Sequence, residues 1–255
     1  GLEGHVAPAY PPWDLDVPDM RRIELWHEEF KKFEADDTLP ALSILRLGGD
    51  HTQGTRAGKP TPRAMIAEND QALGRLVEII SHSKYWSTSA IFVLEDDAQN
   101  GPDHVDAHRS PAFVISPYSL RDVDSTLYTT SAMLRTMELI LGLPPMSQYD
   151  ASARPMYRAL TNRAVPAPFT RKEARVSLTE LNAANPDAAA SEAMNFVEAD
   201  RTPELELNEI LWRSMHGPAS AMPPPRHAAF IRTRAGGDGD DDDDDWLDRV
   251  FKKKR

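Results

Sequence analysis

The sequence predicts an α/β fold whose sheet is largely parallel. Three short apolar runs, at residues 41–47, 90–95 and 111–118, are typical of buried strands. Before and between these runs, apolar residues recur at the 3.6-residue period of an α-helix. Strands that alternate with helices indicate helices packed on a largely parallel sheet.

The first part of the chain supplies an opening loop, two helices and the first strand. Residues 1–18 are rich in proline and aromatic side chains, so we expect an extended loop packed on a surface. A helix begins at Asp19, which can cap it, and its apolar stripe lies in "DMRRIELWHEEFKKFE". The strand at 41–47 leads into the glycine-rich loop "GGDHTQGTRAGKPTP", and a second helix covers residues 61–81.

The second part of the chain supplies two strands and more helices. The strands at 90–95 and 111–118 are followed by a helix over residues 125–141, which Gly142 ends as a C-cap. The pattern weakens after that helix, and "AAASEAMNFVEADRTPELELNEILWRSMHG" suggests two helices split at Pro203. We find no internal repeat.

The composition excludes several classes of protein. With 255 residues, 40% of them hydrophobic, the chain can build a core. No apolar run is long enough to span a membrane. A net charge of −11 argues against a nucleic-acid binder, which would present basic surface. The absence of cysteine removes disulfides, thiolate metal sites and cysteine nucleophiles.

The two ends of the chain each carry an expectation. The chain begins with Gly1 in the run "GLEGHVAPAYPPWDLDVP", so we expect a piece of a longer polypeptide, and no signal peptide is visible. Residues 240–245 are six consecutive aspartates, and we expect this acidic tail to be disordered.

Acidic and histidine side chains follow two of the predicted strands. The stretch "VLEDDAQNGPDHVDAHRS", residues 93–110, crowds carboxylates and imidazoles after one strand, and Asp50 and His51 follow another. Ligand sites in open α/β sheets form at such strand ends. Carboxylates and imidazoles bind hydrolytic divalent metals, and crowded carboxylates repel one another unless a cation offsets them. A solvated loop explains the same composition equally well, so the spacing leaves a metal site and a loop both open.

Two histidines in this stretch lie four residues apart. On a helix His104 and His108 would share a face, as a pair of zinc ligands does. No glutamate follows the first histidine, so the zinc-protease motif is not present. One loop histidine and one histidine paired with a neighbouring carboxylate explain the spacing as well.

Three long runs carry a resemblance to a known family: "LSILRLGGDHTQGTRAGKPTPRAMIAENDQALGRLVEIIS", "YWSTSAIFVLEDDAQNGPDHVDAHRSPAFVISPYS" and "SAMLRTMELILGLPPMSQYDA". Over residues 1–216 the chain resembles the C-terminal half of bacterial phosphoesterases of the acid phosphatase and phospholipase C type, which belong to the alkaline-phosphatase-like superfamily. It is most similar to members that follow a β-propeller in one polypeptide.

The resemblance implies a fold, a division of the chain and a location. The fold would be an alkaline-phosphatase-like sandwich with a metal at the strand ends. Residues 1–160 would be the C-terminal half of the phosphoesterase domain, residues 161–217 a helical extension packed on it, and residues 218–255 a proline-rich linker with the disordered tail. Relatives are commonly exported, which implies a periplasmic or extracellular protein.

The resemblance also implies roles for single residues in the hydrolysis of phosphate esters. Asp96 and Asp97 match paired acids that bind a metal ion, and His108 is similar to a late metal-binding histidine of the superfamily. His51 and His104 match catalytic histidines, of which His51 would contact the phosphate or the metal. The metal could be Zn, Mn, Ca or Mg, because a site rich in oxygen with one or two histidines fits each of them.

The parts of the family's site that this chain lacks limit its predicted activity. The family's metal-binding Glu-Asn pair and its serine or threonine at the metal lie in an N-terminal half, and the Glu68-Asn69 pair here falls within a predicted helix. We therefore expect the chain alone to be inactive and to need that N-terminal half as a partner, and a β-propeller can belong to the same parent chain. The alternative is a binding module that retains the fold without the chemistry.

Overall fold

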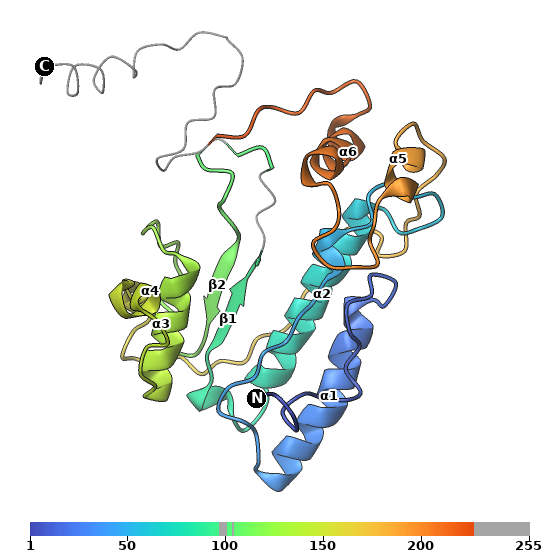
Figure 1. The fold of residues 1–255 in the computed structure, drawn as a ribbon. Helices are drawn as coiled ribbons and strands as arrows, with labels where there is room; N and C mark the ends of the chain where they lie inside the picture. Colours follow the sequence, from blue (N-terminus) through green and yellow to red (C-terminus); the bar gives the residue numbers. More distant parts are fainter. Residues whose placement is uncertain (97–100, 104, 227–255) are drawn as a thin grey trace, which may run out of the picture.

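The computed structural model describes residues 1–96, 101–103 and 105–226. In this part of the chain, six α-helices accompany a hairpin of two strands (Figure 1). The helices are α1 Asp19–Asp36, α2 Pro62–Ser81, α3 Thr130–Leu141, α4 Gln148–Ser152, α5 Ala188–Ala193 and α6 Glu204–His216. The strands are β1 Ile91–Leu94 and β2 Ala112–Ile115.

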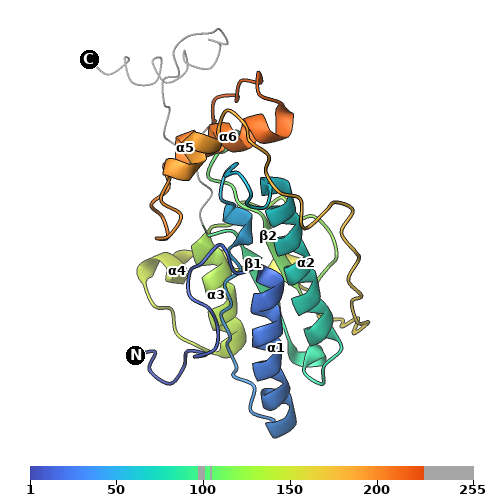
Figure 2. The ribbon, with the colours of Figure 1, turned by 90° about the vertical axis from the view of Figure 1, so that its right-hand side faces the viewer.

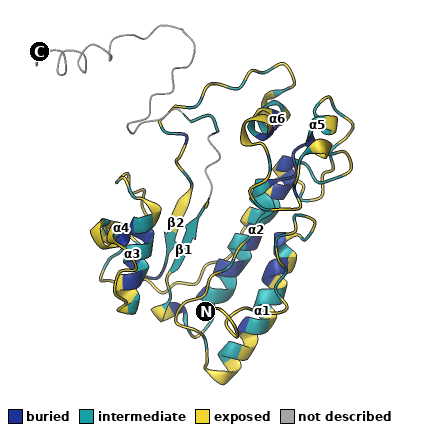
Figure 3. Cartoon of the chain, viewed as in Figure 1, coloured by how far each residue is buried: buried dark blue, intermediate teal, exposed yellow. Residues whose placement is uncertain are grey.

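The two longest helices, α1 and α2, pack side by side and form the core (Figure 1). Helix α2 begins where the sequence predicts, because Pro62 suits the first helical position and the Thr61 hydroxyl accepts a hydrogen bond from the Ala64 N–H at 3.1 Å. Ile23 of α1 meets Ala72 and Leu76 of α2 in a buried cluster. Figure 3 shows buried residues along α2, whereas much of β2 is exposed.

The hairpin of β1 and β2 contradicts the predicted sheet. The two strands are antiparallel, with Ile91 opposite Ile115 and Leu94 opposite Ala112. They are the only strands in the described residues, so the largely parallel sheet of an alkaline-phosphatase-like sandwich is wrong. Parallel strands need a crossover connection, usually a helix, and the described part of residues 95–111 contains none.

The segment at residues 41–47 is extended but is not part of a sheet. It runs along the helices, where Leu45 and Leu47 pack against the core cluster. Leu42 is 49% exposed and Ile44 is 89% exposed. The segment predicted as a strand therefore alternates in exposure only over residues 44–47, and it has no strand partner among the described residues.

The later helices end as predicted but partly begin elsewhere. Helix α3 starts at Thr130, later than expected, because the Thr129 hydroxyl caps it. Gly142 ends the helix with φ of 69°, which confirms the predicted C-cap. Pro203 separates α5 from α6, as predicted, and these two helices lie at the end of the molecule near the start of α2 (Figures 1 and 2). None of the described helices combines the length and apolar character that a membrane crossing requires.

Candidate functional site

The turn at residues 48–55 carries two of the polar residues that the sequence singles out, Asp50 and His51. Asp19, the first residue of α1 and only 1% exposed, holds the start of this turn. Its carboxylate accepts hydrogen bonds from the Gly48 N–H at 3.1 Å and the Gly49 N–H at 2.7 Å. A Cβ at Gly49 would lie 2.6 Å from this carboxylate, so the close approach requires glycine.

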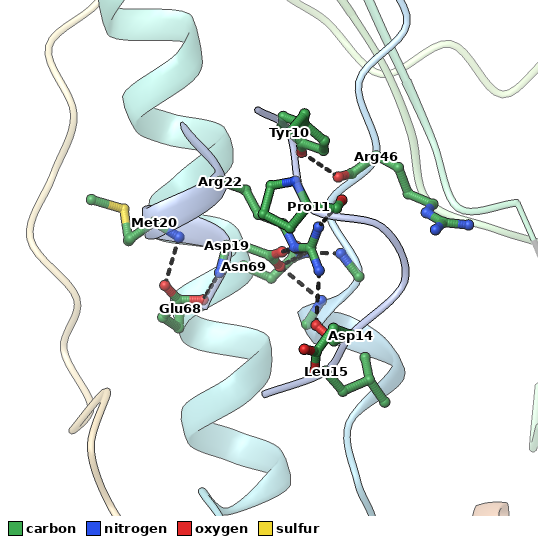
Figure 4. A network of polar contacts seen from close by, with 12 residues as sticks. Tyr10, Pro11, Asp14, Leu15, Asp19, Met20, Arg22, Arg46, Glu68 and Asn69 are labelled. Carbon is green, nitrogen blue, oxygen red and sulfur yellow. Dashed lines mark hydrogen bonds and ion pairs between the residues drawn. The ribbon is translucent and has the colours of Figure 1, made fainter. Parts of the chain in front are cut away.

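Two adjacent residues of α2 complete the support of the turn (Figure 4). The Asn69 amide donates to Asp19 at 3.0 Å and to Asp50 at 3.2 Å, which ties the turn to the helix. The Glu68 carboxylate accepts from the backbone N–H groups of Asp19 at 2.9 Å and Met20 at 2.7 Å, and so caps the N-terminus of α1. Burial raises the pKa of Glu68 above its ordinary value.

Arg22 compensates the buried charge of Asp19 and fixes the opening loop (Figure 4). Its guanidinium is buried, and its Nε lies 3.4 Å from the Asp19 carboxylate. The other nitrogens donate to the carbonyl oxygens of Pro11, Pro12 and Asp14 at 2.8–3.0 Å. The opening loop is therefore bound to the same buried acid that holds the 48–55 turn.

His51 has a fixed ring. Its Nδ1 lies 3.1 Å from the Thr52 carbonyl oxygen, so in the neutral ring Nδ1 carries the proton and Nε2 carries the lone pair. Trp13 and Phe196 contact the imidazole edge-on, at centroid distances of 5.3 and 6.0 Å. Nε2 has no hydrogen-bond partner among the residues that the structure describes. The ring is thus oriented while one nitrogen keeps its capacity to accept a proton or bind a metal.

Thr52, directly after His51, has a strained backbone. Its φ of 64° and ψ of 179° belong to a region that is almost reserved for glycine, and Thr is β-branched and fully buried. Residues further along the turn are fixed by α5, since the Thr55 N–H donates to the Ser191 hydroxyl at 3.0 Å. Such strain persists only where the surroundings over-determine the conformation, and it is enriched at functional sites.

The predicted ligands after β1 are only partly described. Asp96 lies exposed one residue beyond Glu95, at the end of the strand. Asp97 and His104 lie outside the described residues. The geometry of the paired acids is therefore known for Asp96 alone.

The 101–110 loop, described except for residue 104, is shaped by Asp103. Its carboxylate accepts from the N–H groups of Val105 at 2.6 Å and Asp106 at 3.1 Å, and it pairs with Arg109 at 2.9 Å. The Val105 bond, followed by the Arg109 bond, lowers the pKa of Asp103 to about 2. One of the crowded carboxylates thus has a structural role in folding the loop.

His108 faces the acid that precedes it by two residues. Its side chain is 56% exposed, and its Nδ1 lies 3.0 Å from the Asp106 carboxylate. Across the described residues, no group of three or more acidic or histidine side chains is arranged to hold a metal ion. Asp96, His51 and His108 offer suitable donor atoms, but the described residues do not form a complete metal site on their own.

Sequence patterns did not reveal the residues that support the 48–55 turn. Asp19 is expected only as a helix cap, and Glu68 and Asn69 only as helix residues. Their contacts with the turn bridge 19 to 30 positions along the chain, from the Asn69 bond to Asp50 to the Asp19 bond to Gly49. A single sequence contains no local signal for such pairings.

Similarity to known proteins assigns no role to either loop. His51 and the neighbouring acid Asp50 are therefore interpreted from their geometry and from the sequence resemblance. No family model, curated protein or solved structure matches this chain.

Proposed function

We propose that this chain carries one part of the active site of a metal-dependent phosphoesterase. The observation that supports the proposal most is the construction around His51. A fixed imidazole presents Nε2 from a turn that is held by a buried acid and followed by the strained Thr52. A loop that served only as a connection would not require this degree of fixation.

His51 is the residue through which this turn acts in the proposed site. A phosphoryl group presents negatively charged oxygens, and an imidazole can bind a metal through Nε2 or donate a hydrogen bond to phosphate when it is protonated. The carbonyl of Thr52 fixes the tautomer. Trp13 and Phe196 fix the direction of the ring, so its orientation is set before a ligand arrives.

The loop after β1 supplies the other groups that this chain would contribute to the proposed site. Asp96, Asp97 and His108 would bind a divalent metal, Zn, Mn, Ca or Mg, and His104 would act as the second catalytic histidine. Their carboxylate and imidazole atoms have the chemistry that such ions prefer. A bound divalent ion would polarise the phosphoryl oxygen of the substrate.

The attacking group and the rest of the metal site would come from another stretch of polypeptide. In the proposal this is the N-terminal half of the same domain, with a serine or threonine hydroxyl and further metal ligands. The substrate class is a phosphate ester. The chain alone would then bind metal weakly and show no turnover.

A phosphatase assay tests the proposal on a polypeptide that joins this chain to the proposed N-terminal half. The substrates are p-nitrophenyl phosphate and its diester, with Zn, Mn, Ca or Mg added in turn. His51→Gln should lower kcat/KM by about a thousandfold, and Asp97→Asn by several orders of magnitude. His82→Gln is the matched control, because this histidine is exposed at the end of α2 and its Nδ1 contacts only near neighbours, the Glu78 carbonyl oxygen and the Ser81 hydroxyl.

Two results would contradict the proposal. One is the absence of hydrolysis with all four metals in a folded protein that contains both halves. The other is unchanged turnover in His51→Gln. Elemental analysis tests the alternative of a binding module without the chemistry. Such a module should purify without stoichiometric metal, both as this chain alone and when joined to the N-terminal half.

A further inference from the structure

The backbone of residues 41–47 is extended and unpaired. In the described part of the chain, none of its N–H or C=O groups bonds to other backbone, and the Arg46 carbonyl oxygen accepts only from the Tyr10 hydroxyl at 2.5 Å. Seven extended residues span about 23 Å, the length of an ordinary strand. A row of unpaired backbone groups of this kind is the template on which another strand pairs.

The side chains of residues 44–47 alternate in exposure as in a strand covered on one face, whereas residues 41–43 are all exposed. Leu45 and Leu47 pack against Ile23 and its neighbours in the core of α1 and α2. Leu42 and Ile44 point away from that core, with 49% and 89% of their surface exposed. An apolar residue as exposed as Ile44, between unpaired backbone groups, indicates a surface that another segment covers.

We propose that residues 41–47 accept a β-strand from a different polypeptide. The partner is an extended segment with alternating apolar side chains, which pairs with the backbone and covers Leu42 and Ile44. A helix laid over this strip would cover the side chains but would leave the backbone groups unpaired. The pairing is independent of any catalytic group in the partner, and so goes beyond the proposed function.

A second copy of the chain fits the surface less well. A two-fold pairing through residues 41–47 covers only this strip. Large apolar side chains are also exposed elsewhere, on β2 at Phe113 (52%) and on α3 at Leu139 (51%). A different polypeptide can cover these surfaces together with the strip.

Hydrogen exchange with a strand probe tests the proposal on the 255-residue chain. The probe is a synthetic peptide of alternating valine and threonine with a lysine at each end, and deuterium uptake is followed by mass spectrometry on the millisecond scale. When nine-tenths of the protein molecules carry the probe, deuterium uptake at residues 41–47 should slow about tenfold, while uptake in α3 is unaffected. A peptide of the same length with proline at every second position, which lacks half of the donors, should have no effect.

Two variants and one concentration series complete the test. Ile44→Pro removes a backbone donor and should abolish the slowing, while its helical circular dichroism stays native; Leu139→Thr on α3 should keep the slowing. Unchanged uptake at residues 41–47 with saturating probe, or equal slowing on α3, overturns the proposal. Slowing that appears without the probe as the chain is concentrated, together with a dimer in sedimentation, overturns it in favour of a second copy.

Discussion

The 48–55 turn and the 101–110 loop are both polar segments that follow strand-like runs, but they are held in different ways. The turn is fixed from far along the chain, by Asp19 at its start and by Ser191, which is 136 positions from Thr55. In the loop, the Asp103 carboxylate bonds to near neighbours along the chain, the N–H groups of Val105 and Asp106 and the Arg109 guanidinium six positions away. The number of acidic residues in a segment therefore does not indicate how firmly it is held.

The difference matters for how each segment can contribute to a site. The ordering of the 48–55 turn is completed when the chain folds, so His51 is oriented before any ligand binds. The shape of the 101–110 loop depends largely on the local bonds of Asp103, and the Ala107 N–H also donates to the distant Arg226 carbonyl oxygen at 2.7 Å. A segment of this kind can adjust its shape when a partner or an ion arrives.

The largest effect is expected at Asp19, the acid that anchors the turn. Asp19→Ala leaves the N–H groups of Gly48 and Gly49 and the charge of Arg22 without their buried acceptor. The free energy of unfolding should fall by about 3–5 kcal/mol in a urea titration. Asp36→Ala, an exposed acid on the same helix, should change it by less than about 0.5 kcal/mol. Equal losses in the two variants would show that the carboxylate does not hold the turn.

A pair of glycine variants measures how tightly α5 closes on the turn. Gly54 and Gly58 both have positive φ, 59° and 76°, so alanine is strained at each. A Cβ at Gly54 would lie 2.6 Å from the Ser191 hydroxyl, whereas a Cβ at Gly58 meets nothing within 4 Å. Gly58→Ala should cost about 1 kcal/mol and Gly54→Ala about 3 kcal/mol of unfolding free energy. The contact with Ser191 is refuted if both cost the same.

The stability contributed by Glu68, beside the 48–55 turn, and by Asp103, in the 101–110 loop, should depend on pH in opposite directions. Burial raises the pKa of Glu68 above 4.5, so its stabilisation is complete below that value and is lost as pH rises through the folded pKa. Asp103 has its pKa lowered to about 2, so its stabilisation is complete above 3.8 and is lost as pH falls through about 2. Carbon-13 NMR titration of the side-chain carboxyls measures both. If the pKa values of Glu68 and Asp103 both lie above, or both below, their ordinary values, the two carboxyls do not differ in the predicted way.

The smallest effect is expected within the 101–110 loop. Asp103→Asn weakens the bonds to the Val105 N–H and to Arg109, which only shape the loop itself. The amide protons of Val105 and Asp106 should exchange faster, while the midpoint of urea unfolding stays unchanged. A clear shift of that midpoint would show that the loop belongs to the same cooperative unit as α1 and α2.

Local signals in the sequence predicted the helices well. The apolar stripe predicts α2, and Gly142 and Pro203 mark helix boundaries that the structure has. The prediction of a parallel sheet is wrong because strand direction depends on which apolar runs pair with each other. That pairing is not determined by the residues within each run. Residues 90–95 and 111–118 have the composition of parallel strands, yet their connection permits only a hairpin in the described residues.

The candidate site shows the same division between local and distant information. Asp50 and His51 were identified because polar residues that follow an apolar run are visible in a window of ten residues. The buried carboxylate of Asp19 and the bridging amide of Asn69 were missed as supports of the turn, because only the packing of α1 on α2 brings them there. The roles of Asp97 and His104 remain predictions.

The hydrogen bonds between the 48–55 turn and α5 also bear on the order in which the chain folds. The contact between Thr55 and Ser191 closes a loop of 136 positions, and loop closure becomes slower and entropically more costly with length. The contacts between α1 and α2 involve much shorter separations. We therefore expect α1 and α2 to associate early, and the turn to reach its final conformation only after the distant segment has been synthesised and docked.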